Sequence, residues 1–168
     1  MGEIIQKQDS RRIFIDTLIE LAEKDPSIIL MVCDVGFNYI ENFSWRFSKR
    51  FINTGVTEQS TMIIAAGLAL SGLKPYVYSM INFVTFRPYE MIRNAVCLHN
   101  ANVKIIGIKG SEGYKFLGFS HNLIAEDEEI KALENLPGLK IFVVEEPERV
   151  KKVILETYKT NSPCYIRI

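Results

Sequence analysis

The sequence predicts an α/β fold with three layers, in which a six-stranded, mostly parallel sheet lies between two layers of helices. Short β-branched, apolar runs alternate along the chain with stretches of helical periodicity, as in a parallel sheet with helical crossovers. The first such run, residues 28–33, is apolar at every position, which is typical of a strand covered on both faces. With 168 residues, the chain is long enough for a single domain, 1–168, with a sizeable core.

The first half of the chain alternates helix and strand signals. Ser10 can cap a helix that continues through Glu23 and ends before Pro26. The helix that starts near Thr57 has apolar residues on every side, so we expect it to be buried. The other elements expected here are a short helix near residues 43–47, a strand at 50–52, the end of the Thr57 helix at Leu70 followed by Ser71-Gly72, and a strand at 75–80.

The second half continues the alternation. The predicted elements are one long helix from 81 to about 99, a strand at 103–108, a Gly-rich loop at 110–120, a helix near 127–134, a strand at 140–144, a helix near 146–158 and a final strand at 164–168. In such sheets, ligands bind beyond the carboxyl ends of the strands. We therefore expect the site in the loops that follow the strands.

Composition excludes several classes of protein. The formal net charge is zero and no basic stripe stands out, so no nucleic acid or anionic membrane surface is expected as a partner. The N-terminus lacks a signal-peptide pattern and no apolar run spans a membrane, so we expect a cytoplasmic protein. Cys33, Cys97 and Cys164 have no metal-like spacing and are expected as small core residues. No Walker loop, Gly-x-Gly-x-x-Gly turn or metal cluster is present.

Glu58 is the first candidate functional residue. With Thr57 as the N-cap, it lies in the first turn of the predicted helix, where a carboxylate can simply complement the helix dipole. However, a carboxylate at the end of a buried helix, at the ligand edge of a sheet, is costly unless it has a partner. The local pattern alone leaves both interpretations open.

Several collinear stretches resemble the pyrimidine-binding domain of the transketolase family. They are Phe51–Gln59, Ala65–Pro75, Asn82–Asn94, Gly118–His121, Leu136–Leu139 and Pro163–Arg167. The matches cover nearly the whole chain in order, which makes them more specific than any one motif. The resemblance implies the thiamine-diphosphate-binding fold and thiamine diphosphate as the cofactor.

The resemblance also implies roles for individual residues. In this family, a glutamate at the position of Glu58 hydrogen-bonds a ring nitrogen of the aminopyrimidine and so activates the cofactor for catalysis. Phe83 and Phe86 match aromatic residues that pack against this ring. Met80 stands where relatives often carry phenylalanine and can also contact a ring.

Two further residues are implied near the substrate. His121 matches a catalytic histidine beside the substrate carbonyl and hydroxyls, where it can donate hydrogen bonds or relay protons. Asn122 departs from the usual pattern, and the stretch up to residue 127 is longer than usual. Arg87 matches an arginine that can bind a substrate phosphate or hydroxyl.

Other polar residues have less specific interpretations. Arg93 is expected at an interface or on the surface, and His99 as a favourable charge at a helix end. Asp34 can either form a turn or join a polar network beside the cofactor.

The resemblance implies half of an active site. The family holds the diphosphate and its Mg²⁺ or Ca²⁺ with a Gly-Asp-Gly loop that this chain lacks, so a separate diphosphate-binding subunit is the expected partner. The Thr57 helix and residues 83–93 are the expected contact surfaces, in a heterotetramer of two chains of each kind.

The expected reaction is a transketolase-like transfer of a two-carbon ketol unit between sugars. The alternatives are the pyrimidine-binding subunit of a 2-oxo-acid decarboxylase or dehydrogenase, and a non-catalytic assembly subunit.

Overall fold

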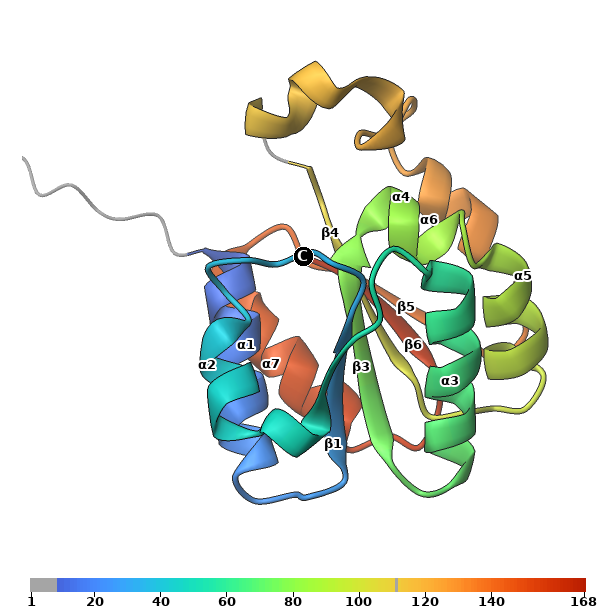
Figure 1. The fold of residues 1–168 in the computed structure, drawn as a ribbon. Coiled ribbons are helices and arrows are strands. Elements are labelled where there is room, and N and C mark those ends of the chain that lie inside the picture. The colour runs from blue at the N-terminus through green and yellow to red at the C-terminus, as the bar shows by residue number, and fades with distance from the viewer. Residues whose placement is uncertain (1–8, 111) are drawn as a thin grey trace, which may run out of the picture.

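A computed structural model describes residues 9–110 and 112–168 as a three-layer α/β/α domain (Figure 1). Its centre is a six-stranded sheet with the order β2-β1-β3-β4-β6-β5, and every neighbouring pair is parallel. The predicted fold class is therefore confirmed. All six strands end at the same edge of the sheet, because all run in one direction.

The strands lie close to their predicted positions. They are β1 (Ile28–Val32), β2 (Phe51–Asn53), β3 (Lys74–Met80), β4 (Lys104–Ile108), β5 (Lys140–Val143) and β6 (Cys164–Arg167). The four inner strands β1, β3, β4 and β6 are buried over almost their whole length. This agrees with the continuous apolar runs that predict strands covered on both faces.

The helices form the two outer layers. They are α1 (Ser10–Ala22), α2 (Glu41–Arg46), the 3₁₀-helix η1 (Ser48–Arg50), α3 (Glu58–Leu70), α4 (Ile81–Thr85), α5 (Tyr89–Met91), the π-helix η2 (Ile92–Cys97), the 3₁₀ segment η3 (Glu112–Ser120), α6 (Glu128–Leu133) and α7 (Pro147–Tyr158). Figure 1 shows α1, α2 and α7 on one side of the sheet and α3 and α5 on the other. The α4 helix and η3 lie at the edge where the strands end.

Each face of the sheet has its own hydrophobic core. Along β1, Leu30 packs into the core beneath α1 and α7, whereas Met31 packs into the core beneath α3 and η2. This follows from the alternation of side chains along a strand. The three cysteines are buried and unpaired, as predicted. Burial raises the pKa of Cys97 and of Cys164 to about 11, so these thiols are inert core residues.

The predicted long helix after β3 is wrong. The chain forms the short helix α4, breaks at residues 86–88, and resumes as α5 and η2. Pro88 explains the break, because it lacks a backbone N–H and disfavours helical backbone at the preceding residue, Arg87. The break places Arg87 at a turn beside the start of α3, where Gln59 Nε2 donates a hydrogen bond to the Arg87 carbonyl at 3.2 Å.

Two smaller predictions about helices also need correction. Asp9, rather than Ser10, caps α1, because its carboxylate accepts a hydrogen bond from the Arg11 N–H at 2.9 Å. The α3 helix is buried on one side only, since Ile63, Ile64 and Leu70 are 51%, 46% and 60% exposed. Its inner side packs on the sheet, but no described residue of this chain covers its outer side.

The segment predicted as a Gly-rich loop after β4 is partly helical. Residues 112–120 form 3₁₀ turns with a kink at Gly118, whose φ is +66°. Figure 1 shows this segment projecting beyond the edge where the strands end. Over the described ranges, no helix combines the length and the apolar character needed to cross a membrane.

Candidate functional site

A cavity of about 490 Å³ opens at the edge of the sheet where the strands end. Its walls come from the segments that follow β1, β2, β3 and β4. The volume lies within the range of about 300–1,000 Å³ that is usual for small-molecule sites. Five of the six predicted site residues line this cavity: Glu58, Met80, Phe83, Arg87 and His121.

Glu58 is the first residue of α3 and is only 5% exposed. Thr57 occupies the N-cap position as predicted, but its hydroxyl donates to the Thr54 carbonyl at 2.9 Å rather than capping the helix. The Glu58 carboxylate therefore stands at the positive end of the helix dipole, within the cavity. A buried carboxylate needs a charge partner or several hydrogen bonds.

A polar network fixes the turn before Glu58. The hydroxyls of Thr54 and Thr61 lie 2.6 Å apart, and Thr54 Oγ1 donates to the Val32 carbonyl at 3.1 Å. Cys33 Sγ lies 3.5 Å from Thr61 Oγ1. Burial raises the pKa of the Cys33 thiol, although the two hydroxyls oppose the shift. These contacts tie the end of β1 to the start of α3, and so hold Glu58 in place.

Arg87 is the charge partner of Glu58. Its Nη1 lies 2.6 Å from Glu58 Oε1, and its guanidinium lies 3.8 Å from the centre of the Phe83 ring. The Arg87 side chain is 41% exposed, so the pair is half open to solvent. The guanidinium thus neutralises the carboxylate and at the same time covers a face of the aromatic ring.

Phe83, which contacts Arg87, also contacts the ring of His121. Phe83 lies on α4 and is 7% exposed, and its ring meets the His121 ring edge-to-face with 4.9 Å between centres and an angle of 78°. Residues 38 positions apart in the sequence therefore lie side by side at the end of β3. The resulting chain of contacts is carboxylate, guanidinium, phenyl ring and imidazole.

The other two predicted residues differ in their placement. Met80 ends β3 and lines the cavity, in agreement with its expected position. Phe86 follows α4 at the break before Pro88, is 39% exposed and is not among the described residues that line the cavity. The geometry of the single chain therefore does not support a ring-packing role for Phe86.

The residues with less specific predictions are also placed. Arg93 is exposed and donates from Nη1 to the neighbouring Asn94 side chain at 2.7 Å, and His99 is exposed after η2. Asp34 forms a turn, as the first of its two interpretations predicts. It has a left-handed backbone with φ of +55°, and it exchanges hydrogen bonds with Asn53 while lining the cavity.

Sequence reasoning missed the far wall of the cavity. This wall includes Arg11 of α1, and Asn38 and Tyr39 of the loop after β1. Gly36 in that loop has φ of +91°, and an added Cβ would lie 2.8 Å from the Tyr78 ring. Gly36, two residues after Asp34, was the one signal for this wall in the sequence, because a glycine allows the loop to pack against β3.

A charged cluster lies at the same edge but outside the cavity. Arg167, which is 4% exposed, is paired with Asp127 at 2.7 Å, Glu129 at 2.9 Å and Glu145 at 3.1 Å. Burial alone would lower the pKa of Arg167, but its hydrogen bonds to Asp127 and Glu129 raise it. The cluster fastens the start of α6 to the end of β6.

No metal site is evident in the part of the chain that the structure describes. There, no group of three or more histidine, cysteine, aspartate and glutamate side chains is arranged to hold an ion. The cavity combines the buried Glu58 carboxylate and its Arg87 partner with several aromatic rings, Phe83 among them, and the His121 imidazole. Such a set suits an aromatic, hydrogen-bonding ligand.

The fold and the cavity together define an α/β domain with a ligand-sized cavity at the carboxyl edge of its sheet. The sequence matches the family described as transketolase, pyrimidine binding domain, over residues 6–168. The chain belongs to this family. The family implies thiamine diphosphate as the cofactor.

Two relatives match almost all of this chain but only about half of their own length. An apulose-4-phosphate transketolase subunit of Phocaeicola vulgatus is 30% identical over 159 residues, which are 94% of this chain and 50% of that protein. A putative transketolase C-terminal section of Methanocaldococcus jannaschii is 30% identical over 154 residues, 91% of this chain and 48% of that protein. The chain thus spans about half the length of these relatives.

Solved structures agree with the fold. A split-gene transketolase, determined as an inactive beta4 tetramer, superposes with a TM-score of 0.81 at 29% identity, covering 94% of this chain and 50% of that one. The transketolase of Campylobacter jejuni superposes equally well, with a TM-score of 0.81, 17% identity and coverage of 97% and 27%. At that identity, the second likeness shows the fold alone.

Proposed function

We propose that this chain is the pyrimidine-binding subunit of a split, thiamine-diphosphate-dependent, transketolase-like enzyme that transfers a two-carbon ketol unit between sugars. The observation that carries the proposal is Glu58, a carboxylate that is 5% exposed and opens on a cavity walled by Phe83 and Met80. Relatives named as transketolase subunits support the reaction class. The proposed location is the cytoplasm.

The residues present fit an aminopyrimidine ring. The Glu58 carboxyl can bond a ring nitrogen, the Phe83 ring offers an aromatic face, and Met80 supplies an adaptable apolar wall. When bound, the cofactor supplies the electron sink for carbon–carbon bond cleavage. The part of this chain is to orient the pyrimidine, to exclude water from it and to hold a proton at the Glu58 carboxyl.

Arg87 must give up part of its contact with Glu58 and Phe83 when the aminopyrimidine ring binds. Its guanidinium now holds Glu58 at 2.6 Å and covers Phe83 at 3.8 Å, so it contacts the two groups that the ring would use. We infer that the guanidinium turns toward the substrate, where it can bind a phosphate or hydroxyl as the family resemblance implies. His121, on the other side of Phe83, is placed to contact the same substrate.

We place the diphosphate and its Mg²⁺ or Ca²⁺ on a separate partner chain. The exposed apolar face of α3, formed by Ile63, Ile64 and Leu70, supports an assembly in which another subunit covers it. A relative that forms a beta4 tetramer supports self-association as well. The proposed working form is a heterotetramer of two chains of each kind.

The test is reconstitution with a candidate partner that carries a Gly-Asp-Gly loop, together with thiamine diphosphate and Mg²⁺. We expect ketose-phosphate-dependent transfer to an aldehyde only when both chains are present. The Glu58→Gln variant should lower kcat at least about 10²-fold, within the range for a positioned acid–base group. Glu148→Gln, at an exposed acid in the first turn of α7, is the matched control and should remain active.

The alternatives predict different outcomes. Activity with 2-oxo acids but not with ketose phosphates would favour a decarboxylase or dehydrogenase subunit. Full activity of the complex with Glu58→Ala would favour a non-catalytic assembly subunit. Activity of this chain alone would contradict the split site.

A further inference from the structure

The turn that carries His121 is held by contacts from a different part of the chain. Asn82, on α4, donates two hydrogen bonds from its amide Nδ2, to the Phe119 carbonyl at 3.1 Å and to the Asn122 carbonyl at 3.0 Å. These two carbonyls lie on either side of Ser120 and His121 in the sequence. One amide therefore fixes both ends of the turn and sets the height of His121 above the sheet.

Gly110 lets the turn approach the end of β4. A Cβ added at this position would lie 3.2 Å from the His121 carbonyl oxygen and 3.1 Å from Asn122 Oδ1, which is tighter than ordinary contact. A glycine is therefore favoured where this turn packs. Asn82 thus holds the turn by hydrogen bonds, and the lack of a side chain at Gly110 lets the turn pack closely on the end of β4.

Ser120 contacts both a backbone carbonyl and a ring nitrogen of His121. The Ser120 hydroxyl donates to the Leu117 carbonyl at 3.1 Å and lies 2.7 Å from His121 Nδ1. A hydroxyl has a single hydrogen and a carbonyl can only accept, so both contacts are satisfied together only when the hydrogen of Ser120 points to Leu117. In that arrangement Ser120 Oγ accepts from Nδ1–H, and in a neutral imidazole this leaves the lone pair on Nε2.

The ring orientation is fixed as well. The Phe83 ring meets the imidazole at 78° with 4.9 Å between centres, and His121 lines the 490 Å³ cavity. With Nδ1 engaged by Ser120, Nε2 is the ring nitrogen that remains for a ligand in that cavity. A lone pair accepts from a hydroxyl, whereas an N–H would donate to a carbonyl oxygen.

We propose that Ser120 and Asn82 are positioning residues that hold His121 as its Nδ1–H tautomer, so that Nε2 accepts a hydrogen bond from a ligand hydroxyl. This proposal rests on the proposed function. It adds that His121 contacts a hydroxyl group of the sugar rather than its carbonyl.

The tautomer can be measured on the chain as it is, without partner or cofactor. The protein has two histidines, so a long-range ¹H–¹⁵N spectrum of the ¹⁵N-labelled chain at about pH 8, above the ordinary imidazole range, resolves both. We expect His121 in the Nδ1–H form. The exposed His99 is the internal reference and should show the Nε2–H form that prevails in water.

Variants test the roles of Ser120 and Asn82 independently. Ser120→Ala should shift the tautomer ratio of His121 about fivefold or more toward Nε2–H, the factor expected from the loss of one ordinary hydrogen bond. Ser120→Thr keeps the hydroxyl and should restore the ratio, and Ser48→Ala, at an exposed serine that begins η1, should leave it unchanged. Asn82→Ala should abolish the nuclear Overhauser contacts between the His121 and Phe83 rings.

Any of three outcomes would overturn the proposal. An Nε2–H ring in the wild type, or an unchanged ratio in Ser120→Ala, would remove the role of Ser120. Unchanged ring contacts in Asn82→Ala would remove the role of Asn82. None of these results depends on thiamine diphosphate, so a failure here is distinct from a failure of reconstitution.

Discussion

At the residue scale, the pair formed by Glu58 and Arg87 connects stability to ligand binding. Glu58 is almost fully buried, whereas the Arg87 side chain is 41% exposed. Exposed ion pairs contribute about 0.2–1 kcal/mol, while breaking a buried pair costs about 3–5 kcal/mol. This pair lies between these limits, because solvent screens only one partner.

We predict a coupling energy of about 1–2 kcal/mol between these two side chains. The double-mutant cycle uses Glu58→Gln, Arg87→Met and the combined variant, with free energies of unfolding from urea titrations of the free chain. Arg87→Met alone should destabilise the chain, because the Glu58 carboxylate remains buried without its cation. The combined variant should recover part of that loss.

Arg93→Met is the matched control for the cycle. Arg93 is exposed and its guanidinium bonds the neighbouring Asn94 side chain, so its replacement should change the free energy of unfolding by less than about 0.5 kcal/mol. Additive effects of Glu58→Gln and Arg87→Met, within about 0.3 kcal/mol, would show that the two side chains do not stabilise one another.

At the element scale, α3 has two faces with different roles. Met62, Ala65 and Ala66 are buried against the sheet, whereas Ile63, Ile64 and Leu70 are exposed. Sequence periodicity could not separate these faces, because both are apolar and only the fold decides which one meets the sheet. An exposed apolar face of this kind indicates contact with another chain.

We predict that Ile64→Asp prevents association through α3 without unfolding the chain. A charge at the centre of an apolar interface must be desolvated, so assembly should weaken by about tenfold or more, whereas an exposed position costs the monomer less than about 0.5 kcal/mol. Sedimentation velocity of the chain, alone and with the partner, measures the assembly.

Trp45→Asp provides the comparison. Trp45 is 77% exposed on α2, in the helical layer on the other side of the sheet. It should leave the assembly unchanged. If Ile64→Asp and Trp45→Asp associate equally well, α3 is not the contact surface.

At the scale of the whole molecule, the layers and the site were predictable to different degrees. Periodicity locates all six strands, because the central ones read as unbroken apolar runs such as 28–32. It fails where one residue changes the backbone, as at Pro88, which interrupts the predicted long helix.

The site was predictable through the family resemblance rather than through local pattern. Glu58, Phe83 and His121 meet only because parallel strands bring their loops to one edge. The contacts of Asn82 span about 40 residues, and nothing in the sequence around it marks them. The pairing of Arg87 with Glu58 likewise depends on the break at Pro88, which periodicity did not reveal.

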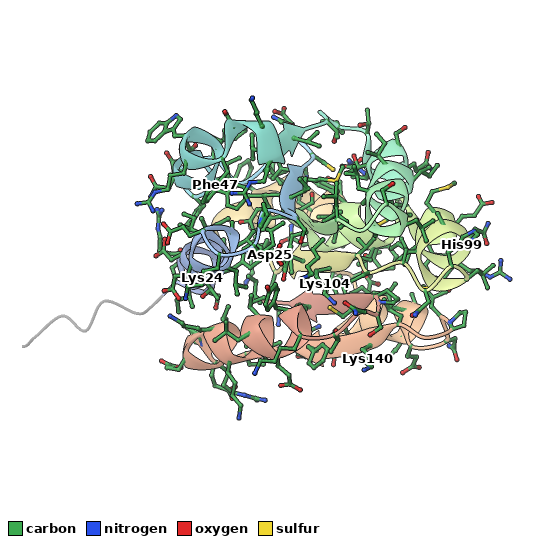
Figure 2. The ribbon with its side chains drawn as sticks, turned by 90° about the horizontal axis from the view of Figure 1, so that it is seen from below. Lys24, Asp25, Phe47, His99, Lys104 and Lys140 are labelled. Atoms are coloured by element: carbon green, nitrogen blue, oxygen red, sulfur yellow. The ribbon has the colours of Figure 1, made fainter. Side chains whose placement is uncertain are left out.

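The edge opposite the cavity holds a hydrogen-bonded carboxylate, Asp25. Figure 2, seen from below, shows Asp25 near the middle of this edge, with Lys104 close by. Asp25 accepts hydrogen bonds from Lys74 at the start of β3, at 2.7 Å, and from Tyr158 at the end of α7, at 2.9 Å. It therefore links the loop before β1 to β3 and to α7. Burial alone would raise the pKa of Asp25, but hydrogen bonds from Lys74, Ser27 and Tyr158 hold it well below its usual value.

This depressed pKa predicts how stability depends on pH. Below about pH 3.9, the ordinary pKa of aspartate, the unfolded chain binds a proton at Asp25 that the folded chain does not, so the free energy of unfolding falls as pH falls. Asp25→Asn should lower stability at pH 7 by about 1.5–3 kcal/mol, as for lost hydrogen bonds to a charged group, and should flatten the decline between about pH 4 and pH 2. Urea titrations at pH 7, 4, 3 and 2 measure both effects.

Asp16→Asn, at an exposed aspartate on α1, should keep the wild-type slope of stability against pH. An equally steep decline in Asp25→Asn would mean that other carboxylates carry the acid sensitivity, and that the bonds joining β3 and α7 at this edge do not depend on the charge of Asp25.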